Sequence, residues 1–100
     1  MMDRDLLSAE AIASLATRLP NWDFDGTSLS RVLEFADFAE AFAFMVRVAD
    51  IAEELDHHPD WSNSWNRVTI AVTSHSAGGL TGMDIGFADR VDRLVDDQPG

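Results

Sequence analysis

Three histidines are the residues of this chain best suited to proton-transfer chemistry. His57 and His58 are adjacent within residues 53–61 (EELDHHPDW), and His75 follows a later run with strand-like alternation. Because the unperturbed pKa of an imidazole lies near neutrality, such a side chain can both donate and accept protons. Three imidazoles, each expected at the end of a helix or strand, therefore predict acid–base catalysis.

Two other interpretations of the histidines remain open. Three imidazoles can hold a catalytic zinc ion, but adjacent residues on a helix or strand point apart, so we expect no metal site. A histidine near a helix C-terminus is also favoured by the helix dipole. That effect accounts for His57 or His58 singly and leaves the whole arrangement unexplained. Asp84, Asp56 and Glu53 are the candidate carboxylates for orienting the rings.

A long helix is expected to carry the adjacent pair. Asp37 is its predicted N-cap, Glu40 completes an acidic variant of the capping box, and residues 38–55 contain no glycine or proline. Pro59 lacks an amide hydrogen and disfavours the α conformation at the preceding residue. The helix is therefore expected to stop at about His57 or His58, where the two rings can point in different directions.

Two apolar stripes on this helix cover more surface than one packed face requires. One stripe should lie on the sheet of the domain and the other should form a subunit contact. We place Val48 in that contact and expect Val48→Asp to give smaller assemblies that still fold. The first stripe is Phe38, Phe42, Met45, Ala49 and Ala52, and the second is Phe44, Val48, Ile51 and Leu55.

The remaining patterns predict an α+β fold. A helix should run from the N-cap Ser8 to Pro20, followed by a hairpin across residues 22–35 with a turn at Asp25-Gly26. Residues 65–75 alternate as a strand, and a short fourth strand should end at Leu80. Residues 81–84 (TGMD) resemble a capping box that starts the last helix. The order α-β-β-α-β-β-α implies one domain, residues 1–100, with a four-stranded antiparallel sheet and three helices on one face.

Composition excludes several classes of function. The 100 residues carry a formal charge of −11, which repels polyanions, so we expect no nucleic-acid binding. No apolar run approaches the ~18 residues of a membrane span, and the first residues lack a signal-peptide pattern. The chain contains no cysteine. These features predict a cytoplasmic protein that does not associate with membranes.

The chain also resembles the pterin-4a-carbinolamine dehydratase family. The resemblance rests on Glu53 followed by His57-His58-Pro59 and Trp61, on residues 72–75 (VTSH), and on Gly79-Leu80-Thr81 with Asp84. It extends over nearly the whole chain. The sequence departs from the family at Trp65, where relatives commonly have tyrosine, and at Ser76 and Met83, where charged residues are frequent.

The resemblance implies a dehydratase that converts 4a-hydroxytetrahydropterin to quinonoid dihydropterin and water, with the pterin as substrate and no cofactor. It implies His57, His58 and His75 as catalytic residues, with His57 and His75 transferring protons and His58 binding and assisting. The substrate-binding residues that it implies are Glu53, Pro59, Ser74, Ser76 and Asp84.

The second helix predicts how the protein assembles, and the same resemblance implies an alternative function. We expect a homodimer or homotetramer in which that helix supplies much of the interface. Animal members of the family also bind a homeodomain transcription factor. The alternative function is therefore a non-catalytic protein-interaction module, which would not need the full set of histidines.

Overall fold

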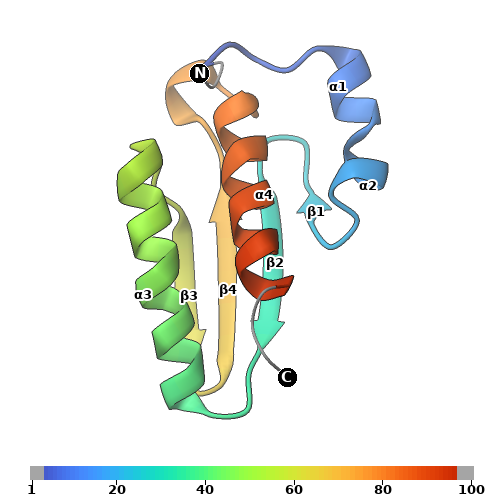
Figure 1. Ribbon diagram of the computed structural model, residues 1–100. Helices are drawn as coiled ribbons and strands as arrows, with labels where there is room; N and C mark the ends of the chain where they lie inside the picture. The colour runs from blue at the N-terminus through green and yellow to red at the C-terminus, as the bar shows by residue number, and fades with distance from the viewer. Residues whose placement is uncertain (1–3, 97–100) are drawn as a thin grey trace.

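The computed structural model describes residues 4–96, which form an α+β fold around one four-stranded antiparallel sheet with the strand order β1-β2-β4-β3 (Figure 1). The predicted fold class is thereby confirmed. The elements are α1 (Ala9–Ala13), α2 (Leu15–Arg18), β1 (Asp23–Phe24), β2 (Leu29–Glu34), α3 (Phe38–Leu55), β3 (Asp60–Ser64), β4 (Arg67–Val72), the 3₁₀ turn η1 (His75–Ala77) and α4 (Gly82–Asp96).

Helices α3 and α4 run in opposite directions over one face of the sheet, and the α1–α2 segment lies beside α4 (Figure 1). The core between the helices and the sheet is built from alternate residues of β4 and β2 and from the inner sides of both helices. Within residues 4–96, no helix is both long enough and apolar enough to cross a membrane. The largest fully buried apolar side chains are Leu19, Leu29, Phe44, Val48, Val68, Ile70, Val72, Phe87 and Val91.

The predicted first helix is interrupted at Ser14. Its predicted N-cap is confirmed, because the Ser8 hydroxyl accepts a hydrogen bond from the Ala11 amide at 3.1 Å. The Ser14 hydroxyl donates to the Ala11 carbonyl at 2.7 Å, and α2 starts afresh at Leu15. A serine that bonds its own backbone in this way competes with regular helix hydrogen bonds, which explains the break.

The predicted hairpin is confirmed by the pairing of Asp23 with Ser30 and of Phe24 with Leu29. Hydrogen bonds from the amides of Thr27 and Ser28, together with the Ser28 hydroxyl, lower the pKa of Asp25 to about 2. Gly26, at φ +106°, takes a backbone conformation that other residues rarely adopt. The turn thus has the chemistry that its Asp-Gly sequence predicts.

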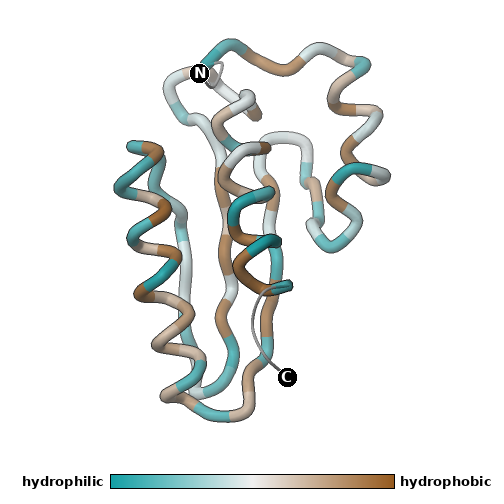
Figure 2. Tube along the Cα trace, in the orientation of Figure 1, coloured by the Kyte–Doolittle hydropathy of each residue, from teal (hydrophilic) through white to brown (hydrophobic). Residues whose placement is uncertain are grey.

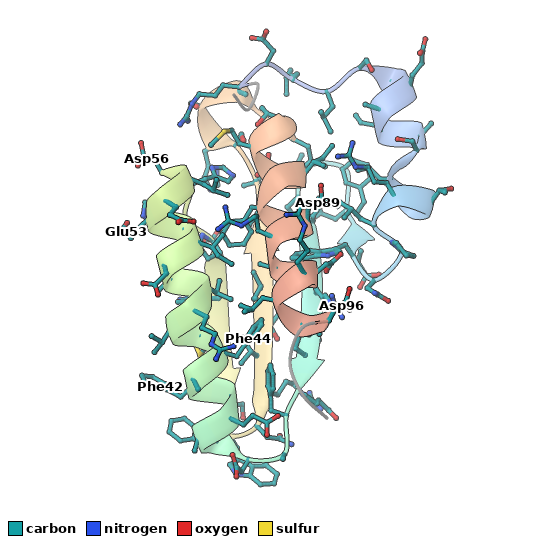
Figure 3. The ribbon with its side chains drawn as sticks, in the orientation of Figure 1. Phe42, Phe44, Glu53, Asp56, Asp89 and Asp96 are labelled. Atoms are coloured by element: carbon teal, nitrogen blue, oxygen red, sulfur yellow. The ribbon has the colours of Figure 1, made fainter. Side chains whose placement is uncertain are left out.

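Our assignment of the two stripes on α3 was wrong. The Asp37 cap is present, since its carboxylate accepts the Glu40 amide at 2.8 Å. However, Val48 is fully buried in the core of the chain itself, so Val48→Asp would disrupt folding instead of separating subunits. Phe42 is 53% exposed and points away from the core, opposite to Phe44 (Figure 3). The exposed stripe is therefore Phe38, Phe42 and Val46.

Hydropathy along α3 explains why the pattern did not distinguish its faces. Figure 2 shows apolar residues through the N-terminal half of the helix and polar residues mainly in its C-terminal half. Where apolar side chains surround a helix, only its neighbours decide which side is buried. Here α4 and β4 make that choice, because both pack against α3.

Helix α3 ends at Leu55, two residues before the earliest end that we predicted. Asp56 adopts the left-handed conformation (φ 50°, ψ 46°), and the His57 amide donates to the Ala52 carbonyl at 3.0 Å. This is a regular way of closing a helix, usually with glycine in the left-handed position. The chain turns away before His57, so neither histidine belongs to the helix.

The third and fourth strands differ from the predicted ones. β3 (Asp60–Ser64) was missed, because its sequence DWSNS is polar and exposed and has few residues with high β-propensity. Trp65 (φ 50°) lies in the turn between β3 and β4, and β4 begins at Arg67. Leu80 does not end a strand; its carbonyl accepts the Leu7 amide at 2.9 Å beside an isolated bridge between Leu6 and Thr81.

The predicted capping box of the last helix is present. The Thr81 hydroxyl accepts the Met83 amide at 3.1 Å, and the Asp84 carboxylate accepts the Thr81 amide at 2.9 Å. The predicted apolar side of α4 faces the core, where Ala88 and Val91 are fully buried. The box holds the start of α4 against the loop that follows β4.

Candidate active site

One end of the molecule brings together four segments that are far apart in the sequence. The C-terminal end of α3, the loop after β4, the start of α4 and the N-terminal segment all meet there (Figure 1). Glu53 and Asp56 lie at this end of α3 (Figure 3). The three histidines belong to two of these segments, His57 and His58 to the first and His75 to the second.

His57 is held by a buried carboxylate. Its Nε2 lies 2.6 Å from Asp84 Oδ1, and its side chain is only 11% exposed. The ring also packs edge-on against Phe87, with the ring centroids 6.3 Å apart. Because a carboxylate accepts hydrogen bonds, this contact selects the tautomer with the proton on Nε2. Nδ1 is then left with a lone pair that can accept a proton.

Asp84 is fully buried, and each of its oxygens has a donor. Oδ1 faces His57, while Oδ2 accepts the Ser74 hydroxyl at 2.8 Å and the Thr81 amide at 2.9 Å. The Thr81 hydroxyl lies 2.9 Å from Ser74 Oγ and extends the network. Since a buried carboxylate without partners would be costly, this network both stabilises Asp84 and fixes its orientation.

His58 has a different environment. Its Nε2 lies 2.6 Å from Glu53 Oε2, but the two side chains are 59% and 78% exposed. Exposed pairs of this kind contribute little to stability. The contact can orient the His58 ring without burying it, and Glu53 is one of the carboxylates that the sequence suggested for this task.

His75 opens the 3₁₀ turn η1 and is 84% exposed. It does not end a strand, because β4 stops at Val72. Its Nε2 lies 3.9 Å from Asp60 Oδ2, a carboxylate at the start of β3 that the sequence analysis did not consider. Asp60 could be found only after β3 had been recognised, since pairing of β3 with β4 brings it near His75.

The three histidines line one surface cavity of about 340 Å³. It is also lined by Arg4, Asp56, Thr73, Ser74 and Ser76. The predicted site residues Ser74 and Ser76 are thus part of it. Arg4 and Thr73 are lining residues that the sequence analysis missed, and no pattern in the sequence singles them out.

The other predicted site residues lie beside the cavity or behind it. Pro59 and Glu53 line a neighbouring groove together with His58, Trp61 and two alanines of α3. Asp84 is behind His57 and is shielded from solvent. Among residues 4–96, no three histidine, cysteine, aspartate or glutamate side chains are grouped so that they could hold a metal ion.

Comparisons with known proteins agree on one family. The family model described as pterin 4 alpha carbinolamine dehydratase matches residues 5–94. A protein of Rhizorhabdus wittichii, provisionally named a pterin-4-alpha-carbinolamine dehydratase, is 46% identical over 97 residues, which cover 95% of this chain and 100% of the relative. A similarly named protein of Mesorhizobium japonicum is 46% identical over 92 residues, 90% of this chain and 94% of the relative.

Solved structures give the same result. The crystal structure of a transcriptional coactivator/pterin dehydratase from Brucella melitensis matches with a TM-score of 0.83 and 36% identity, and covers 90% of this chain and 98% of that one. A pterin dehydratase-like protein identified as a RuBisCO assembly factor shares the fold, with a TM-score of 0.62 and 24% identity over 77% of this chain and 89% of that one.

Proposed function

The chain belongs to the pterin-4a-carbinolamine dehydratase family, and from this premise we propose that it dehydrates 4a-hydroxytetrahydropterins. The observation that carries the proposal is the meeting of three histidines around one cavity, two of them within 2.6 Å of a carboxylate oxygen and the third 3.9 Å from one. We assign the protein to the hydro-lyases and expect it to act in the cytoplasm.

The reaction needs one proton donor and one proton acceptor. The donor protonates the C4a hydroxyl, the C4a–O bond breaks, and water leaves. The acceptor removes the N5 proton, and the electrons of the N5–H bond form the new N5=C4a double bond. Imidazoles suit both steps, because neither direction of proton transfer is strongly uphill near neutral pH.

His57 and His75 are the proposed proton-transfer residues, and His58 binds the substrate and assists. The Nδ1 lone pair of His57 can accept a proton, and the buried Asp84 carboxylate would then stabilise the imidazolium that forms. His75 is exposed at the cavity and can exchange protons with solvent between turnovers. The two roles could exchange between substrate stereoisomers.

The proposed binding residues have two kinds of role. Ser74 and Ser76 line the cavity and offer hydroxyl groups to the substrate, while Glu53 and Pro59 support His58 from the adjoining groove. Asp84 was proposed as a substrate-binding residue. Because Asp84 is fully buried behind His57, we now assign it to positioning the His57 ring.

The purified protein is expected to accelerate the dehydration of a synthetic 4a-hydroxytetrahydropterin, followed by the absorbance of the quinonoid product. The rate should persist after exhaustive chelation, because the proposed steps use imidazoles alone. Absence of acceleration with any 4a-hydroxytetrahydropterin would refute the dehydratase. Loss of activity in chelator, restored by zinc, would instead show that a metal ion takes part.

A protein-interaction role is the alternative function, and one surface favours it. Phe38, Phe42 and Val46 on α3 are 48%, 53% and 51% exposed, and the rings of Phe38 and Phe42 lie with their centroids 5.8 Å apart. Contiguous exposed apolar side chains usually mark a contact surface. The same stripe is our proposed subunit interface in a homodimer or homotetramer.

Phe42→Asp is expected to reduce the assembly to monomers or smaller oligomers that keep the wild-type fold. The substitution places a charge in the centre of the exposed stripe, where association would have to bury it. Light scattering measures the mass, and circular dichroism checks the fold. Arg47→Asp is the matched control, because Arg47 is an exposed residue of the same helix outside the stripe. A monomeric wild type, or an unchanged mass for Phe42→Asp, would contradict this interface.

A further inference from the structure

Among the residues that the structure describes, Arg4 is the one arginine that lines the histidine cavity. Its position is set by the segment that follows it: Leu6 forms a bridge with Thr81, and the Leu7 amide donates to the Leu80 carbonyl at 2.9 Å. These contacts fix the backbone two and three residues after Arg4 to the stretch between η1 and α4. The guanidinium therefore belongs to the cavity wall although it lies near the start of the chain.

Gly79 shows how closely this segment is applied to the site. Gly79 is buried, and a Cβ atom added to it would lie 3.2 Å from the Leu6 side chain. That distance is tighter than an ordinary van der Waals contact, so a larger residue would require the Leu6 side chain to shift by a few tenths of an ångström. The absence of a side chain at Gly79 allows the N-terminal segment to pack directly beside the loop that carries His75.

Within the part of the chain that the structure describes, Arg4 has no hydrogen-bonding or ionic partner. Four other arginines are paired with carboxylates: Arg18 with Asp89, Arg31 with Asp92, Arg67 with Glu34, and Arg90 with Glu54. A guanidinium carries its charge at every physiological pH and offers five donors. Within residues 4–96, the guanidinium of Arg4 is therefore left to face the cavity.

The described lining of the cavity lacks the acidic excess of the whole molecule, because the formal charges of Arg4 and Asp56 cancel when the histidines are counted as neutral. The chain carries −11 overall, yet the described lining residues combine one arginine and three histidines with a single carboxylate, that of Asp56. Dehydration itself gives no reason for the arginine, because the proposed proton transfers need only the imidazoles. A ligand in the cavity can therefore meet this cation with an atom other than the reacting C4a and N5.

We propose that Arg4 binds an anionic group, a phosphate or carboxylate, on the C6 side chain of the pterin substrate. This inference rests on the proposed dehydratase function and deepens it by naming the substrate class. An arginine fork can hold either anion through two parallel hydrogen bonds. Arg4 is then a specificity-determining residue, and the reaction that supplies the substrate acts on pterins with a charged side chain.

The test uses three synthetic 4a-hydroxytetrahydropterins that differ only at C6, with a methyl, a propionate or a hydroxymethyl phosphate ester. We expect the wild-type protein to show a kcat/KM about tenfold higher for at least one anionic substrate than for the methyl compound, the scale of a hydrogen bond to a charged group at a partly exposed site. Arg4→Gln should abolish that ratio, and Arg4→Lys should restore part of it, because lysine keeps the charge without the fork.

Arg47→Gln is the matched control, because it removes the same charge from an exposed arginine of α3 that lies outside the cavity. The ratio should survive this change. The propionate and phosphate arms show which anion the site takes. Equal kcat/KM values for all three substrates, or a ratio that Arg4→Gln leaves intact, would overturn the proposal.

A binding measurement tests the anion site independently of the proposed dehydratase activity. Oxidised pterins are fluorescent and do not react, so the affinities of 6-methylpterin, pterin-6-carboxylate and the phosphate ester of 6-hydroxymethylpterin can be measured by titration. If the protein dehydrates none of the three substrates, the proposed dehydratase function is refuted. An Arg4-dependent preference for either charged pterin in this titration would still support the anion site, and its absence would overturn it.

Discussion

His57→Ala and His75→Ala are each expected to lower the rate of pterin dehydration by roughly 10²–10⁴-fold, the usual contribution of a general acid or base. The two histidines approach the cavity from separate segments, one after α3 and one in η1. Each would therefore act on a different atom of the substrate. The measurement is the single-turnover rate with a saturating synthetic 4a-hydroxytetrahydropterin.

Folding should survive both changes, but their effects on stability should differ. His57 is 11% exposed and bonds to Asp84, so His57→Ala leaves one oxygen of a buried carboxylate without its donor, at a cost of about 1–3 kcal/mol. His75 is 84% exposed, and its removal should leave the melting temperature within experimental error. His57→Gln is a useful control, because its amide can still donate to Asp84 but cannot transfer protons.

Near-wild-type rates in both alanine variants would refute the assignment of these roles. A slow His57→Ala variant combined with a fast His57→Gln variant would show that His57 acts only by supporting Asp84. A slow His75→Ala variant has no such structural explanation, because the side chain is almost fully solvated. A slow His75→Ala variant would therefore be the less ambiguous kinetic evidence. The buried, hydrogen-bonded His57 is the stronger structural evidence for a site.

The features predicted correctly from the sequence are those encoded by neighbouring residues. Ser8 and Asp37 cap helices, Asp25-Gly26 forms a hairpin turn, and Thr81 with Asp84 forms a capping box. Each of these signals acts within three residues, so a local pattern contains all of its chemistry. The strand β4 was recognised for the same reason, because Val68, Ile70 and Val72 alternate with residues of the other face and β-branched residues dominate the run.

The features that were missed depend on distant parts of the chain. β3 has a polar sequence and is a strand only because β4 offers it a partner edge. Both stripes of α3 are apolar, and the packing of α4 and β4 against the helix determines that the stripe containing Val48 is buried. Asp56 takes a left-handed conformation more typical of glycine or asparagine, so the end of α3 had no clear local signal.

The site shows the same division between local and distant information. Histidine chemistry made His57, His58 and His75 recognisable by residue type alone. Their partners were harder to assign: Asp84 lies 27 residues from His57, and Asp60 becomes a neighbour of His75 only through the pairing of β3 with β4. Arg4 reaches the cavity because Leu6 and Leu7 bond to the residues before α4. No sequence pattern encodes that contact.

Asp84→Asn is expected to lower the dehydration rate by roughly 10³-fold while leaving the fold intact, by reversing the tautomer of His57. The oxygen Oδ2 accepts the Ser74 hydroxyl and the Thr81 amide, so the carbonyl oxygen of asparagine must take that position. The amide NH₂ then faces His57 Nε2, which has to become an acceptor. The ring proton moves to Nδ1, and the nitrogen proposed to receive the substrate proton is blocked.

The tautomer can be read directly, which separates this explanation from a general loss of structure. In the wild type, the ¹⁵N chemical shifts of neutral His57 should report a proton on Nε2, and in Asp84→Asn they should report a proton on Nδ1. Asp89→Asn is the matched control on the same helix, because Asp89 pairs with Arg18 and touches no histidine. A slow variant with an unchanged tautomer would reject this mechanism, as would an Asp84→Asn rate within about threefold of the wild type. Because the substituted asparagine can keep both hydrogen bonds of the capping box, α4 should start in the same place, and any loss of rate then reports on His57 alone.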